Sequence, residues 1–223
     1  NIYRSIDFGA SWENVYSHSY NEYSSIDFGY DPLIPSTTYA AIPRGEDGLL
    51  KSIDSGATWT SLGVEDVSIV EVQPRTHRVF IPNHSVCGRQ NGSLCLSADG
   101  GENWESVGDN PQGIDGFTFA PGNASLIYAH TDQGLLKSAD GGQSWNAAAG
   151  ALGHVPIYSL ETVTNTDRLF LYAGTTGGRV QATGLQAQGI AAEETLINAG
   201  VYRYTTRQMQ VYLPLVLRTV TSR

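Results

Sequence analysis

Basic residues are scarce in this chain of 223 residues. Lysine and arginine together number 13, against 22 aspartates and glutamates, which gives a formal net charge of −9. The few basic side chains are scattered along the sequence. Proteins that bind nucleic acid or anionic membranes usually carry a clustered basic patch that neutralises phosphate charge. We therefore expect no nucleic acid and no membrane surface among the partners of this protein.

Long apolar runs are also missing. No stretch of the sequence approaches the roughly 18 consecutive apolar residues that a membrane-spanning helix needs, and no secretory signal pattern is present. We expect no transmembrane segment. The chain starts inside a repeated unit and without Met, which is typical of a mature or partial sequence.

Recognisable catalytic patterns are absent as well. The sequence contains no G-x-S-x-G nucleophile motif, no H-E-x-x-H zinc motif and no phosphate-binding glycine loop followed by lysine. The histidines are too dispersed to predict a metal site, and we expect neither a metal nor a cofactor. These histidines are His18, His77, His84, His130 and His154.

The chain has only two cysteines, Cys87 and Cys95, with Asn91 and Gly92 between them. Asn-Gly is a strong signal for a tight hairpin turn, so the two thiols are expected to face each other across a hairpin. A disulfide, a pair of free thiols and a metal site all fit this spacing, although no nearby ligands complete a metal site. The disulfide is favoured, and it implies an oxidising, extracytoplasmic location: secreted, periplasmic or at the cell surface.

The sequence does contain a short pattern repeated four times, S-x-D-x-G-x-[ST]-W, in which Asn103 is the one departure. Its first serines, at positions 5, 52, 97 and 138, lie 47, 45 and 41 residues apart, and all four tryptophans of the chain belong to it. A period of this length is typical of propeller blades and other stacked units. The repeated residues are Ser5, Asp7, Gly9 and Trp12; Ser52, Asp54, Gly56 and Trp59; Ser97, Asp99, Gly101 and Trp104; and Ser138, Asp140, Gly142 and Trp145.

This pattern resembles the Asp-box, or BNR repeat, of sialidases, sortilin-type receptors, xyloglucan-degrading hydrolases and photosystem II assembly factors. The resemblance implies an all-β fold, namely a β-propeller built from four-stranded antiparallel blades. It also implies that the repeated turns lie on the outer part of each blade, away from any ligand.

The residue types of the pattern are those of a tight turn. Glycine adopts positive φ at little cost, and an aspartate carboxylate can accept hydrogen bonds from backbone N–H groups within the turn. An apolar run precedes each copy, and the tryptophan is expected to begin the return strand with its indole packed over the turn. We therefore interpret the four aspartates as structural rather than as metal ligands or catalytic acids.

Each complete unit is predicted to contain a strand, a polar turn, a strand, a loop, a strand, the repeated turn and a last strand. The first unit lacks its front half, and the unit that begins near Ile157 lacks the repeated turn. Either the N-terminal hairpin closes a four-bladed ring against residues 157–174, or strands at 200–204 and 210–213 complete a fifth unit. We favour about five units. First strands are predicted at 67–72, 117–119 and 157–163, and second strands at 39–41, 80–81, 128–129 and 171–173.

The predicted propeller covers residues 1–205, with a loop insertion at about 184–194. Residues 206–223 form an apolar C-terminal strand or tail, in which Pro214 favours an edge strand. Its partner is the last blade of its own chain, another copy of the chain, or an anchoring apparatus at a cell surface.

Function in a propeller is expected in loops that converge near the central axis rather than in the repeated turns. By the predicted strand order, these loops contain charged and polar candidates for a ligand-binding face. They are Arg44, Glu46, Asp47, His130, Asp132 and Arg179.

The predicted function is a non-catalytic, extracytoplasmic binding or structural platform for a protein, a glycan or other copies of the chain. The alternative is a glycoside hydrolase, either sialidase-like or xyloglucanase-like. A sialidase-like site would need three arginines around a substrate carboxylate and an Arg-Ile-Pro motif that this sequence lacks. A xyloglucanase-like site would need two opposed carboxylates in a cleft, and a single propeller usually supplies only half of such a cleft.

Overall fold

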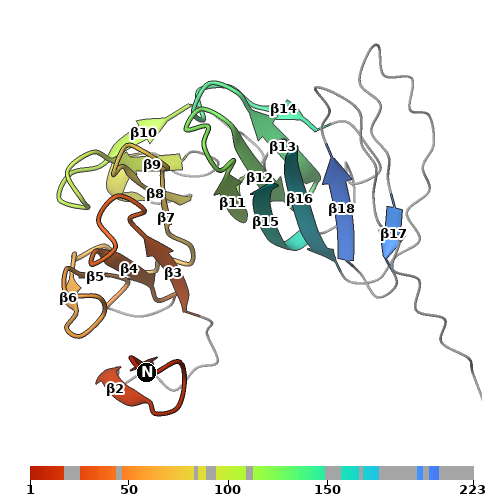
Figure 1. The fold of residues 1–223 in the computed structure, drawn as a ribbon. Coiled ribbons are helices and arrows are strands. Elements are labelled where there is room, and N and C mark those ends of the chain that lie inside the picture. Colours follow the sequence, from red (N-terminus) through yellow and green to blue (C-terminus); the bar gives the residue numbers. More distant parts are fainter. Residues whose placement is uncertain are drawn as a thin grey trace, which may run out of the picture.

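The computed structural model of the chain describes residues 1–17, 26–43, 47–82, 85–88, 94–108, 113–148, 157–165, 168–175, 195–197 and 201–205. In these ranges the chain is built from β-strands, with one short 3-10 helix at Ser85–Cys87. The strands pair antiparallel in five sheets that follow one another in chain order along an arc (Figure 1). The predicted all-β class and the four-stranded antiparallel sheets are confirmed.

The sheets are numbered here in chain order. The first contains β1 (Ile2–Arg4) and β2 (Glu13–Tyr16), and the second contains β3 (Asp27–Tyr30), β4 (Thr38–Ala41), β5 (Leu49–Ser52) and β6 (Thr60–Ser61). The third contains β7 (Glu71–Val72), β8 (Val79–Pro82), β9 (Leu94–Ser97) and β10 (Glu105–Val107), and the fourth contains β11 (Gly116–Phe119), β12 (Ile127–Thr131), β13 (Gly134–Ser138) and β14 (Asn146–Ala147). The fifth contains β15 (Ile157–Asn165), β16 (Arg168–Thr175), β17 (Thr195–Ile197) and β18 (Val201–Thr205).

The first strands differ most from expectation. The strand predicted at 67–72 is reduced to β7, because the preceding segment buries Val64, Val67 and Val70 without joining a ladder. Strand β3 was not predicted at all. Its Gly29 passes so close to the backbone of Val70 that a Cβ atom would lie 2.8 Å from the Val70 carbonyl oxygen, so a strand-forming side chain is excluded there.

Neighbouring sheets pack face to face, and the side-chain alternation of the strands explains how. On β8, Val79 and Ile81 join a buried cluster with the second sheet, whereas Phe80 joins a cluster with Phe117 and Phe119 of the fourth sheet. All four residues of β8 are buried, as expected for a strand covered on both faces. Two further clusters connect the first sheet to the second and the fourth to the fifth.

The two ends of the arc resolve one of the predicted alternatives. The N-terminal hairpin β1–β2 forms a sheet of its own, and β16 pairs with β15 and β18, so the hairpin does not pair with residues 157–174. In the fifth sheet the strand order is β15-β16-β18-β17, in which the last two strands exchange places relative to the other sheets. The predicted strand at 200–204 corresponds to β18. The insertion at 184–194, the strand at 210–213 and the tail at 206–223 lie outside the described residues.

Candidate functional site

The four repeated turns (residues 5–12, 52–59, 97–104 and 138–145, called box turns below) share one hydrogen-bond pattern. In each, the serine hydroxyl donates to the aspartate and accepts a hydrogen bond from the N–H of the glycine four residues later. The same carboxylate accepts a hydrogen bond of 2.9 Å from the N–H of the residue before the tryptophan, and another from that residue's side chain. Each aspartate is therefore engaged inside its own turn.

These hydrogen bonds also explain the acidity of the four carboxyl groups. The bonds from the residue before the tryptophan are the main cause, and they lower the pKa of Asp7, Asp54 and Asp140 to about 2 and that of Asp99 further. The aspartates are consequently ionised at any ordinary pH. A carboxylate in this state neither donates a proton nor serves as a base near neutrality, which agrees with a structural role.

The tryptophans close the turns from one side. The indole nitrogens of Trp12, Trp59 and Trp104 donate to the carbonyl of the glycine three residues earlier, at 3.1–3.2 Å. Trp59, Trp104 and Trp145 also pack on the cores of the sheets, whereas Trp12 at the N-terminal end is 64% exposed. The return strands begin one residue after the tryptophan, at Glu13, Thr60, Glu105 and Asn146, rather than at the tryptophan as expected.

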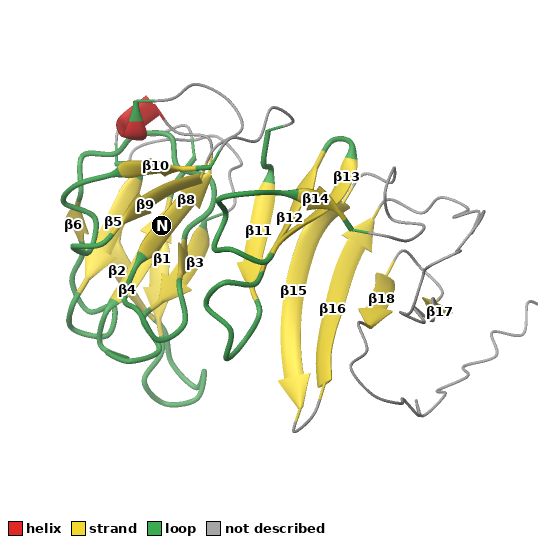
Figure 2. Ribbon diagram, turned by 90° about the horizontal axis from the view of Figure 1, so that it is seen from above, coloured by secondary structure: helices red, strands yellow, loops and turns green. Residues whose placement is uncertain are grey.

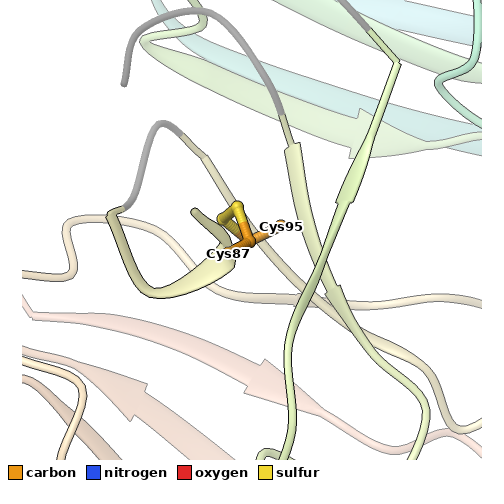
Figure 3. Close-up of a disulfide and its surroundings, with 2 residues drawn as sticks. All are labelled: Cys87 and Cys95. Carbon is orange, nitrogen blue, oxygen red and sulfur yellow. A yellow bond between two sulfur atoms is a disulfide. The ribbon is translucent and has the colours of Figure 1, made fainter. Parts of the chain in front are cut away.

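Cys87 and Cys95 form a disulfide (Figure 3), with Cα atoms 5.6 Å apart. Of the three states that the sequence allowed, the structure has the disulfide. Cys95 lies in β9 and is completely buried in the cluster shared by the second and third sheets. The bond therefore attaches the 3-10 helix Ser85–Cys87 to the interior of the third sheet.

The predicted ligand-face residues are not brought together in the part of the chain that the structure describes. Burial, together with the hydrogen bond to Asp47 and its charge, raises the pKa of Tyr16 to about 12. His130 is buried, and its Nδ1 atom has no hydrogen-bond partner among the described residues. Asp132 is exposed in the turn between β12 and β13. Arg44, Glu46 and Arg179 lie outside the described residues.

The first strands of four sheets instead surround a pocket that the sequence did not predict. Strands β3, β7, β11 and β15 contact one another in this order along the inner side of the arc, and Figure 2 shows β11 and β15 side by side. The pocket, called the axial pocket below, has a volume of about 460 Å³ and lies where these strands and the turns that follow them meet. Its lining includes Phe28, Tyr30, Leu33, Glu71, Arg75, Thr118, Phe119, Glu161 and Thr162.

Side-chain hydrogen bonds hold the walls of this axial pocket in place. Asp27 accepts a hydrogen bond of 3.0 Å from the Val70 N–H, which joins β3 to the segment before β7. The hydroxyls of Thr118 and Thr162 lie 3.3 Å apart, and Thr162 donates to the carbonyl of Phe119, which joins β11 to β15. The pocket is thus framed by strands that are hydrogen-bonded to one another, with the turns after them completing its lining, and this favours a fixed geometry.

Two glutamates and one aspartate make the pocket electrostatically unusual. Burial, together with the negative charges of Asp27 and Glu161, raises the pKa of Glu71 to about 8. Burial, opposed by hydrogen bonds from the backbone, also raises the pKa of Asp27, and burial and the charge of Asp27 raise that of Glu161. Glu71 is therefore mostly protonated at neutral pH, and it lies near two carboxyl groups whose pKa values are also raised. Among the described residues, no group of three or more His, Cys, Asp or Glu side chains has the arrangement of a metal site.

A signal for this pocket was present in the sequence. Glu71 interrupts an otherwise apolar run between Val70 and Val72, and Glu161 lies inside the strand that begins at Ile157. Glutamate is rare inside an apolar strand run, because its charge disfavours burial. Two such residues in the first strands of separate units mark the inner side of the arc.

No helix among the described residues is long and apolar enough to cross a membrane.

No known protein-family profile matches the chain. A xyloglucanase from Paenibacillus sp. is 29% identical over 110 residues, which cover 44% of this chain and 11% of that protein. The chain thus spans about a tenth of the length of this curated relative.

Solved structures resemble the chain at low sequence identity. A GH74 enzyme from Niastella koreensis matches with a TM-score of 0.55 and 21% identity, covering 78% of this chain and 25% of that one. An ancestral GH74 enzyme matches with a TM-score of 0.53 and 16% identity, over 78% and 24% of the two chains. The endosialidase of phage phi92 matches with a TM-score of 0.50 and 11% identity, over 88% and 38%. These neighbours are β-propellers, and the likeness identifies the fold of this chain as that of β-propeller proteins.

Proposed function

We propose that this chain is part of an extracytoplasmic Asp-box β-propeller that binds a polysaccharide in its axial pocket without cleaving it. The observation that carries the proposal is the pocket itself, in which two exposed aromatic side chains lie beside carboxyl groups. Phe28 is 51% exposed and Tyr30 69% exposed, and both line the pocket with Glu71, Glu161 and Arg75.

The chemistry of this lining suits a sugar. Pyranose rings present apolar C–H faces, which stack on aromatic rings, and hydroxyl groups, which hydrogen-bond to carboxylates and guanidinium groups. A concave site with aromatic walls and a few polar groups is the usual form of a small-ligand pocket, and the volume of about 460 Å³ falls in the usual range. The similarity to a xyloglucanase and to GH74 enzymes supports a polysaccharide as the ligand class.

The extracytoplasmic location rests on the disulfide. Disulfides persist in oxidising compartments and are rare in the cytoplasm. The Cys87–Cys95 bond is therefore expected in a secreted, periplasmic or cell-surface protein.

Calorimetric titration of the purified chain with xyloglucan and cello-oligosaccharides tests the proposal. We expect the glycan to bind, and we expect Tyr30→Ala to weaken this binding by about tenfold. Removal of an aromatic side chain on which a ligand ring stacks costs roughly 1–3 kcal/mol of binding free energy. Tyr158→Ala is the matched control, since Tyr158 is 67% exposed and does not line the pocket. Equal loss in both variants, or no binding of any glycan, contradicts the proposal.

A second candidate function, glycoside hydrolysis, is favoured by one observation. Glu71 is protonated at neutral pH, with its pKa raised to about 8 by burial and neighbouring carboxylates, and it faces the same pocket as Glu161. Cleavage of a glycosidic bond requires two carboxyl groups beside it, one of them protonated to serve as the general acid. Release of reducing ends from xyloglucan by the wild-type chain, abolished in Glu71→Gln, would replace the binding function with this one.

A further inference from the structure

We propose that the axial pocket selects a glycan with free amino groups, such as a β-linked glucosamine oligomer, over a neutral one. This inference rests on the proposed glycan-binding function and specifies further that the bound glycan carries positive charge. The juxtaposition that carries it is a partly buried acid, Glu71, and an exposed acid, Glu161, in one cavity with exposed aromatic rings.

Few basic side chains lie near the carboxyl groups of the axial pocket. Among the described residues that line the pocket, one is basic. This residue, Arg75, is exposed in the turn between β7 and β8. In the described part of the chain, neither Glu71 nor Glu161 forms an ion pair with a basic side chain. A partly buried carboxyl group such as that of Glu71 is normally paired or hydrogen-bonded, so its lack of a basic partner among the described residues leaves room for a cation from outside the chain.

Glu71 differs from Asp27 in this respect. The Asp27 carboxylate accepts the Val70 N–H at 3.0 Å, whereas no described group donates a hydrogen bond to the Glu71 side chain, which lines the pocket. An ammonium group brings three N–H donors and a positive charge. Placed between Glu71 and Glu161, the ammonium group would supply hydrogen-bond donors to the two carboxyl groups and a positive charge to balance theirs.

The aromatic side chains distinguish an amino sugar from other amines. The faces of Phe28 and Tyr30 attract both the apolar face of a sugar ring and a nearby cation. A lysine side chain carries the same ammonium group but has no ring to stack on these two residues. The combination of ring faces and carboxyl groups therefore favours an amino sugar over a basic peptide.

The test compares three oligomers of equal length at about pH 6 and low salt: glucosamine, N-acetylglucosamine and neutral glucose oligomers. We expect the glucosamine oligomer to bind the wild-type chain about tenfold more tightly than the others, as one partly exposed charge pair allows. Glu161→Gln should remove this preference. Glu102→Gln is the matched control, because Glu102 is exposed on a box turn outside the pocket.

Proton release provides a second readout. Burial and the neighbouring charges of Asp27 and Glu161 raise the pKa of Glu71 to about 8, so the group carries a proton at pH 6. An ammonium ligand favours the ionised form, and its binding should displace part of this proton. Calorimetry in two buffers with different ionisation enthalpies should detect the release in the wild-type chain and not in Glu71→Gln.

The possible results separate the two proposals. A tenfold preference that is lost in Glu161→Gln and kept in Glu102→Gln supports the amino-sugar inference. Equal affinity for the three oligomers overturns the inference and leaves glycan binding intact. If no oligosaccharide binds but oligolysine does, in a manner sensitive to Glu161→Gln, the glycan-binding function and the amino-sugar inference are both overturned.

Discussion

The Nδ1 atom of His77 lies 2.6 Å from Oδ2 of Asp31, and this contact joins the β7–β8 turn of the third sheet to the β3–β4 turn of the second. The Asp31 side chain is only 5% exposed, and its other oxygen accepts hydrogen bonds from the N–H groups of Leu33 and Ile34. One carboxylate thus stabilises its own turn and connects it to the next sheet. Both turns border the axial pocket, so the contact also fixes the position of the pocket rim.

Asp31→Asn is expected to destabilise the chain by about 1–3 kcal/mol at pH 7, because a hydrogen-bonded charge is replaced inside the fold. Burial opposes the ionisation of Asp31, but the hydrogen bonds from His77, Leu33 and Ile34 outweigh it and hold the pKa below 3.8. The stabilising effect is therefore present above pH 3.8 and is lost as the pH falls through the lower folded value. Urea unfolding of both chains between pH 3 and pH 7 measures this.

The control for this prediction is Asp132→Asn, since Asp132 is exposed in a turn. It should leave the free energy of unfolding unchanged within about 0.5 kcal/mol at all pH values. A difference between Asp31→Asn and the wild type that does not shrink at low pH would assign the loss to packing rather than to charge.

Glu71→Gln is expected to have the opposite effect on stability. The pKa of Glu71 is raised from 4.5 to about 8, so the folded chain holds a proton that the unfolded chain releases. The wild type consequently loses stability as the pH rises from 4.5 to about 8, and the cost is complete above that range. The variant should be more stable by about 4 kcal/mol near pH 8 and equal to the wild type near pH 4.

Thermal unfolding of the ligand-free chain at these two pH values measures the Glu71 prediction. Glu105→Gln provides the control, because Glu105 is exposed on β10 and away from the pocket. A gain of stability that is the same at both pH values would show that the Glu71 charge is not its source.

Gly108 and Gly63 form a natural pair for testing how closely the sheets approach one another. Both follow the last strand of a sheet with positive φ, 65° and 70°. At Gly63 an added Cβ atom would meet nothing within 4 Å, whereas at Gly108 it would overlap the backbone carbonyls of Gly142 and Gln143 in the next box turn. Since backbone cannot move aside as a side chain can, only the second glycine is required for sheet packing.

Gly63→Ala should therefore cost about 1 kcal/mol, the strain of a left-handed alanine. Gly108→Ala should cost about 2–3 kcal/mol more, because the third and fourth sheets must separate locally. Chemical denaturation of the two variants gives the difference directly. Equal losses would mean that the box turn of the fourth sheet does not rest on Gly108.

The features that the sequence predicted are those set by local chemistry. The hydrogen bonds of Ser97 and Asp99 act within five residues of each other, so the residue pattern alone defines the turn and the hairpin around it. The axial pocket depends instead on which first strands converge, and residues as distant as Tyr30 and Glu161 meet only after the sheets have packed. For the same reason the exchanged strand order of β17 and β18 could not be read from local patterns.

The disulfide gives the last prediction, because its contribution follows from the length of the chain that it closes. Cys87 and Cys95 are eight residues apart, and closing a loop of this size in the unfolded chain is worth about 2–3 kcal/mol. The double variant Cys87→Ser and Cys95→Ser loses this constraint and also places a hydroxyl where Cys95 is fully buried, so its loss should be larger than that of the reduced wild type. Denaturation of the wild type with and without reductant, beside the double variant, separates the two contributions. Unchanged stability on reduction would show that the bond does not constrain the unfolded chain.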